Sequence, residues 1–156
     1  MQFQSRRFYL LTTLLCTAFG AAAQSKLPDF DGNWKLNAAK SDGGPRPLAE
    51  GMTVKWSSNG AEFEVLHQMP NGEMLLKLRS DGKEAVNRMP NGVEMKSTHR
   101  IEDGVLLGEY RIHAERAEMT QLDRISLSAD GKTMTTDREI KTPQGGLKQK
   151  LVFDRQ

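Results

Sequence analysis

The chain has 156 residues, and its 22 Lys and Arg residues nearly balance its 20 Asp and Glu residues. A single domain of this length with mixed charge has no basic surface that would attract nucleic acid or an anionic membrane. The one cysteine, Cys16, excludes an internal disulfide framework and a thiolate metal site.

The N-terminus has the pattern of an export signal. Arg6 and Arg7 precede an uncharged apolar run, which ends in Ala21-Ala22-Ala23, the small residues of a cleavage site. The run is shorter than the roughly 20 residues of a membrane-spanning helix. We therefore expect a cleaved signal peptide over 1–23 rather than a retained anchor, and one domain over 24–156.

Cleavage would also change the charge and chemistry of what remains. Loss of the two arginines lowers the basic count from 22 to 20, equal to the acidic count, and Cys16 is lost with them. Leu15 is too large to precede a lipoprotein cysteine, so we expect no lipid anchor. The arginine pair leaves Sec and twin-arginine export both open. We expect the protein in the periplasm or outside the cell, with no membrane span after cleavage.

The first expected strand, 33–37, opens the folded part. Gly32 lets the backbone approach closely just before this strand, and Trp34 would turn its indole into the base of the fold. The segment 38–51 contains Gly43-Gly44-Pro45-Arg46-Pro47, which breaks any regular element. We expect a loop there, lying across one end of the fold, with one helical turn near its start.

From Met52 onwards, short alternating runs are separated by glycine turns. The turn dipeptides are Asn59-Gly60, Asn71-Gly72, Asp81-Gly82, Asn91-Gly92, Asp103-Gly104 and Asp130-Gly131. These dipeptides suit type I′ hairpin turns, whose two central residues both need positive φ. The charged run 114–118 predicts a longer connection or one helical turn. The expected strands are roughly 33–37, 52–58, 61–68, 73–79, 84–88, 93–101, 105–113, 119–128, 132–140 and 147–153.

Short strands in meander order without a long helical pattern predict an all-β fold. The expected architecture is an antiparallel up-and-down β-barrel of about 8–10 strands. A flattened sandwich is the alternative.

Alternation along the strands predicts which side chains face inward. Most of these side chains are apolar, but polar ones interrupt them: His67, Ser97, His99, Gln121, Asp123, Arg138 and Gln149. A partly wet cavity would tolerate them, because water or a ligand can satisfy their hydrogen bonds. Equally, they could lie near strand ends, where the mouth of a barrel is solvated.

The inward set supplies the candidate binding residues. They are Trp56, Phe63, His67, Met95, His99, Tyr110 and Arg138. The ligand would be small and largely apolar or acidic, with His67, His99 or Arg138 supplying its polar contact.

Patterns for catalysis, metals and cofactors are missing from the sequence. It contains no Gly-x-Ser-x-Gly, no phosphate-binding glycine loop and no His-Glu-x-x-His. We expect no catalytic residue, no metal ligand and no cofactor. Asp123 and His99 would form an acid–base pair only if the barrel brought their strands together.

Two short blocks resemble a known group of proteins. Phe30-x-Gly32-x-Trp34-Lys35-Leu36-Asn37-x-x-Lys40-Ser41 is similar to the opening of small exported bacterial lipocalin-like proteins, and the segments 126–135 and 152–156 agree with their ends. The resemblance implies a barrel that holds a small apolar molecule. It also implies that Trp34 packs at the closed end, under a basic side chain from a late strand. Arg155 is the first candidate for this side chain, with Lys148 and Lys150 as reserves.

Three functions remain open from the sequence. The first is binding of a small, largely apolar molecule in the barrel interior. The second is a non-catalytic structural or protein-interaction module of the cell envelope with a filled core. The third is an enzyme on the same scaffold. The volume of any cavity separates the first function from the second.

Overall fold

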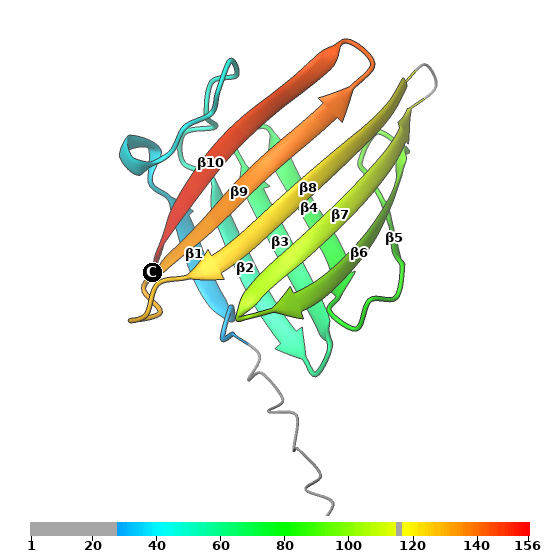
Figure 1. Cartoon of the computed structure of the whole chain (residues 1–156). Helices are drawn as coiled ribbons and strands as arrows, with labels where there is room; N and C mark the ends of the chain where they lie inside the picture. Colours follow the sequence, from blue (N-terminus) through cyan, green and yellow to red (C-terminus); the bar gives the residue numbers. More distant parts are fainter. Residues whose placement is uncertain (1–27, 115–116) are drawn as a thin grey trace, which may run out of the picture.

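The computed structural model describes residues 28–114 and 117–156, so the expected signal peptide lies outside the described residues. The described strands are curved around a common interior (Figure 1). No helix in these two ranges is long and apolar enough to cross a membrane. The elements are β1 (Gly32–Leu36), the short 3-10 helix η1 (Ala38–Lys40), β2 (Thr53–Asn59), β3 (Glu62–Met69), β4 (Gly72–Arg79), β5 (Ala85–Arg88), β6 (Glu94–Glu102), β7 (Val105–Ala114), β8 (Ala117–Leu127), β9 (Thr133–Thr142) and β10 (Gly145–Arg155).

The strands form one antiparallel sheet in the order β4-β3-β2-β1-β10-β9-β8-β7-β6-β5. Strands β1 and β10 pair directly, with Trp34 opposite Arg155. The prediction of an all-β meander barrel is confirmed, and the alternative of a flattened sandwich is wrong, because a single sheet curves round to meet itself.

The barrel is nearly closed, and the seam between β4 and β5 is bridged by a side chain. The Lys77 amide donates to Asn87 Oδ1 (2.7 Å), and Asn87 Nδ2 donates to the Lys77 carbonyl (2.9 Å). The carboxamide of Asn87 thus gives β4 the donor and acceptor that a neighbouring backbone would give.

The expected long connection over 114–118 is wrong. Strand β7 continues to Ala114 and β8 begins at Ala117, with these two residues opposite each other. The charged character of the run does not oppose the ladder, because His113 and Glu118 face each other on the solvent side and are both exposed.

The prediction of type I′ geometry is right at one of the six turn dipeptides. Asp103 (φ 50°) and Gly104 (φ 77°) both have positive φ, and Asp103 is the only such non-glycine residue among those described. At the other five dipeptides only the glycine has positive φ. Asp81-Gly82 does not connect a paired hairpin at all, since the Gly82 amide donates to the carbonyl of His99 on β6 (2.9 Å).

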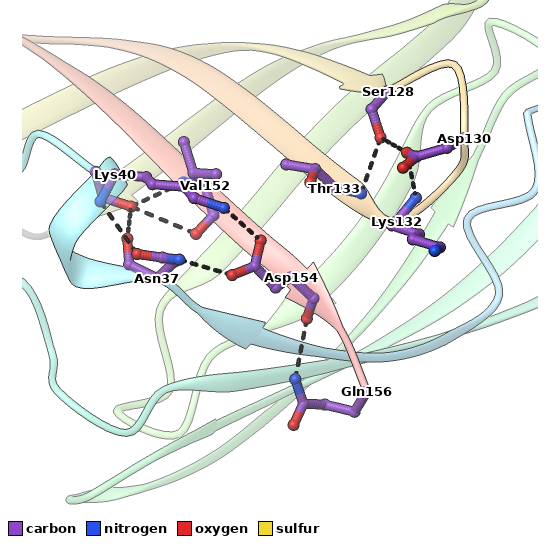
Figure 2. Close-up of polar contacts among 10 residues, drawn as sticks. Asn37, Lys40, Ser128, Asp130, Lys132, Thr133, Val152, Asp154 and Gln156 are labelled. Atoms are coloured by element: carbon purple, nitrogen blue, oxygen red, sulfur yellow. Dashed lines mark hydrogen bonds and ion pairs between the residues drawn. The ribbon is translucent and has the colours of Figure 1, made fainter.

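The start of the loop after β1 folds back along β10 instead of lying across the barrel end. Figure 2 shows Asn37 Nδ2 and Lys40 Nζ both donating to the carboxylate of Asp154, at 2.6 and 3.2 Å. Ser41 Oγ accepts from the Val152 amide (2.9 Å). The expectation that this segment covers the mouth is therefore wrong for its first part, because β10 offers it hydrogen-bond partners.

Trp34 closes the end of the barrel that lies opposite the mouth. It is fully buried, and its Nε1 donates to the Phe30 carbonyl (2.8 Å). The Arg155 guanidinium lies over the indole, with Cζ 4.3 Å from the ring centroid. A Cβ at Gly32, where φ is +126°, would lie 3.2 Å from Arg155 Nη1. The positive φ and the closeness of Arg155 therefore both favour glycine at position 32.

Candidate ligand-binding cavity

The barrel interior contains a cavity of about 470 Å³. Most of its wall is apolar and comes from strands all around the barrel. The apolar side chains other than methionine are Val54, Trp56, Val65, Leu76, Leu78, Tyr110, Ile112, Ile125, Ile140, Leu151 and Phe153. The polar ones are Arg46, His67, Gln121, Asp123, Thr136 and Arg138.

Methionine is the most characteristic residue of the cavity wall. Seven of the eight methionines of the chain line it: Met52, Met69, Met74, Met89, Met95, Met119 and Met134. The unbranched thioether side chain is flexible and polarizable, so such a wall can adapt to ligands of different shapes. Sequence reasoning selected only Met95, although the inward parity of Met74 and Met134 was a usable signal.

Five of the seven candidate binding residues line the cavity, namely Trp56, His67, Met95, Tyr110 and Arg138. The other two lie behind its wall. Phe63 packs edge-on against Trp56, with ring centroids 5.7 Å apart. His99 packs edge-on against Tyr110, with ring centroids 5.0 Å apart. Phe63 and His99 therefore support rings that face the cavity. The sequence predicted that Gln121 and Asp123 face inward but did not select them as binding residues, and it missed Thr136 altogether.

One row of cross-strand neighbours contains four polar residues. The register places one residue from each of five adjacent strands in this row: His99, Gly108, Asp123, Arg138 and Gln149. His99 and Asp123 are only 1% and 2% exposed. The interpretation that the inward polar residues lie at solvated strand ends is therefore wrong for these two.

Asp123 and Arg138 form an ion pair in this row, in which the Asp123 side chain is buried and the Arg138 side chain is 22% exposed. Arg138 Nε and Nη2 donate to the two carboxylate oxygens at 2.9 and 2.8 Å. Gln121 Nε2 adds a third hydrogen bond to Asp123 (3.0 Å). Burial opposes the charge of Arg138, but the Asp123 carboxylate outweighs burial and raises the pKa of the guanidinium. The Arg138 guanidinium is thus held in its charged form.

The two histidines of the interior are neutral at pH 7. Burial lowers the pKa of His99 to about 4, against a smaller opposing effect of Asp123. Burial and the nearby Arg138 charge lower the pKa of His67 to about 4 as well. Burial also raises the pKa of the Tyr110 hydroxyl, which stays protonated. The charged side chains in the cavity wall are therefore the Asp123–Arg138 pair and the exposed Arg46.

The register does not make an acid–base pair of His99 and Asp123. Gly108 separates them in the row, and a Cβ at Gly108 would lie 2.7 Å from His99 Cδ2. Glycine there leaves room for the imidazole, whose two nitrogens have no hydrogen-bond partner among the described residues. The carboxylate of Asp123 bonds instead to Arg138 and Gln121. Over the described ranges, no cluster of His, Cys, Asp and Glu could hold a metal ion.

The sequence matches no model of a protein family and no curated protein. Solved structures are similar. A zebrafish ileal bile acid-binding protein complexed with cholic acid has a TM-score of 0.60 and 17% identity, over 81% of this chain and 98% of its own. Lipid binding protein 8 of Caenorhabditis elegans gives 0.62 and 12%, over 81% and 95%. Fatty-acid-binding protein 1 of Echinococcus granulosus gives 0.55 and 13%, over 81% and 96%.

The fold and its interior cavity thus define a lipocalin-like β-barrel. More particularly, the chain has the fold of the fatty-acid-binding group, with a nearly closed ten-stranded barrel. At these identities the likeness concerns the fold alone.

Proposed function

We propose that the protein binds a small, largely apolar molecule inside its barrel. The observation that carries this proposal is the cavity of about 470 Å³, with an apolar wall and a few converging polar groups. Ligand sites in proteins have this size and composition. The printed names of the similar structures, which refer to bile acid, lipid and fatty-acid binding, support a ligand of the same kind.

We favour binding over the other two functions that the sequence leaves open. A structural module with a filled core would not leave space of this size beside seven flexible methionines. An enzyme would need reacting groups within hydrogen-bond reach of each other, and His99 and Asp123 are not bonded to each other.

The direct test of binding is native mass spectrometry of the purified protein, followed by titration of the lipid-stripped protein with a fluorescent apolar probe. We expect a co-purified small molecule and saturable probe binding. Ile112→Trp, which fills the cavity, should weaken probe binding at least about tenfold by removing the available volume. Val86→Trp is the matched control, because Val86 is 56% exposed. Equal probe affinity in both variants would place the probe outside the barrel.

We further propose that the protein acts in the periplasm or outside the cell after removal of residues 1–23. The basic start, the uncharged apolar run and the alanine triplet support export. The intact mass of protein recovered from the periplasm or medium should correspond to a chain that begins near Gln24. Soluble cytoplasmic protein that retains Met1 would contradict this proposal.

A further inference from the structure

We propose that the ligand presents an uncharged hydrogen-bonding group, such as a hydroxyl or an amide, to the polar side of the cavity, and that carboxylate ligands are disfavoured. This inference rests on the proposed binding function and specifies the chemistry of the ligand. It differs from the sequence-based expectation, in which Arg138 could bind an acidic ligand.

Arg138, a partly buried cation, already has its anion. Arg138 gives two parallel hydrogen bonds to Asp123, whose side chain is 1% exposed. A ligand carboxylate brought to Arg138 would lie beside the Asp123 carboxylate, and two like charges in one buried site repel strongly. The complex would also bury an unmatched negative charge, which is costly away from water.

The remaining polar groups on this side of the wall are neutral. His67 on β3, Tyr110 on β7 and Gln121 on β8 line the cavity together with Arg138 on β9. A neutral imidazole, a phenol and a carboxamide each both donate and accept hydrogen bonds. They suit a hydroxyl or an amide, which also does both.

The exposed Arg46 at the cavity is the competing position for a carboxylate. It has no ion-pair partner among the described residues. Water screens an exposed cation, so its attraction for an anion is weak. The experiment separates this position from Arg138.

The test uses lipid-stripped mature protein and displacement of a fluorescent apolar probe by dodecanol, dodecanamide and dodecanoate, which share one alkyl chain length. At pH 7 we expect the alcohol and the amide to bind at least about tenfold more tightly than the carboxylate, the scale of one unpaired buried charge. Asp123→Asn frees Arg138 and should reverse this order in favour of dodecanoate. Asp137→Asn, on the exposed side of β9, is the matched control and should keep the original order.

The order of the wild-type protein's affinities for the three compounds decides the inference by itself, even if Asp123→Asn does not fold. Tighter binding of dodecanoate than of dodecanol overturns the inference while leaving the proposed binding function intact. If Arg46→Ala then removes that preference, the carboxylate binds at the mouth. Saturable probe binding that none of the three compounds displaces also overturns the inference. If neither the probe nor any compound binds, the proposed function itself fails.

Discussion

At the scale of single residues, Arg155 does more than cover the Trp34 ring, because it also forms hydrogen bonds to other parts of the chain. Its guanidinium donates to the carbonyls of Gly131, Asp31 and Asp29 at 2.8, 2.6 and 2.7 Å. These carbonyls belong to the turn between β8 and β9 and to the segment before β1. Arg155 therefore joins three parts of the chain at the closed end of the barrel.

We expect Arg155→Ala to lower the free energy of unfolding by about 2–4 kcal/mol, because charged donors to three carbonyls are lost together with the contact to Trp34. Trp34→Ala should cost about 3–5 kcal/mol, as for other buried aromatic residues. Urea unfolding measures both. Arg155→Lys should not restore the loss, because an ammonium group cannot reproduce the planar fork. Arg88→Ala, at an exposed position, is the control. A cost for Arg155→Ala no larger than that of the control would refute the structural role.

The two interior histidines predict how stability depends on pH. Burial lowers the pKa of His99 and of His67 from 6.5 to about 4 in the folded protein. The unfolded chain therefore binds these protons first as the pH falls. The stability contributed by the neutral imidazoles is complete above pH 6.5, falls between 6.5 and about 4, and then levels off.

The measurement is the free energy of unfolding at several pH values across this window. The charged and titratable groups near His99 are Asp123, Arg138 and Tyr110. The pKa values of Arg138 and Tyr110 are raised, away from this window. His99→Gln should flatten part of the slope, whereas His113→Gln, at an exposed position, should leave it unchanged. Equal slopes in the two variants would contradict the assignment to His99.

Single residues also show what the sequence can and cannot predict. The inward direction of Asp123 and Arg138 follows from alternation along one strand. Their ion pair does not, because it depends on the register between β8 and β9, and a slip of one residue would turn one side chain outward. The sequence therefore predicted the members of the site but treated Arg138 as free for a ligand.

At the scale of elements, the seam between β4 and β5 depends on one carboxamide. Asn87 is 7% exposed and bonds both backbone groups of Lys77. We expect Asn87→Ala to cost about 1–3 kcal/mol, since it leaves these groups without their partner. Hydrogen exchange of the Lys77 amide should become faster as the seam opens locally. Val86→Ala, on the exposed side of the same strand, is the control. Unchanged protection of Lys77 would show that other contacts hold the seam.

The sequence predicted which strands form and the order in which they pair, but it did not predict all the connections between them. The meander follows from the turn dipeptides and alternating runs between them. The run around Glu118 was mistaken for a connection because it is rich in charge. Its charged side chains are compatible with a strand whose outer face is solvated. The fold-back of the loop after β1 depends on Asp154, which is remote in sequence and gives no local signal.

At the scale of the whole molecule, the resemblance visible in the sequence and the cavity lie in different places. Some residues of the two similar blocks bond to one another, as Asn37 and Lys40 do to Asp154 (Figure 2). Others close the barrel end, as Trp34 and Arg155 do. The polar cavity residues His67, Gln121 and Arg138 lie outside these blocks. The resemblance could therefore predict the barrel but not the chemistry of its ligand.

Occupation of the cavity should stabilise the entire barrel. A ligand that binds only the folded state adds RT ln(1 + [L]/Kd), or about 2.7 kcal/mol at a hundredfold excess over Kd. Thermal unfolding of the lipid-stripped protein should therefore shift upward with added dodecanol, and the shift should grow with ligand concentration. The Ile112→Trp variant should show little shift. The same shift in both proteins would mean that binding occurs outside the cavity.

The bond between Asn37 and Asp154 joins residues that are 117 positions apart along the chain. A ribosome adds about 5–20 residues per second, so roughly 6–23 s separate the synthesis of these two partners. During that interval β2 can already pair with β1, but the other side of β1 presents open backbone groups to any strand nearby. Strand β10, which is synthesised last, thus covers the open side of β1, which is synthesised first. A delay in synthesis lengthens the time in which β1 can pair with a wrong strand.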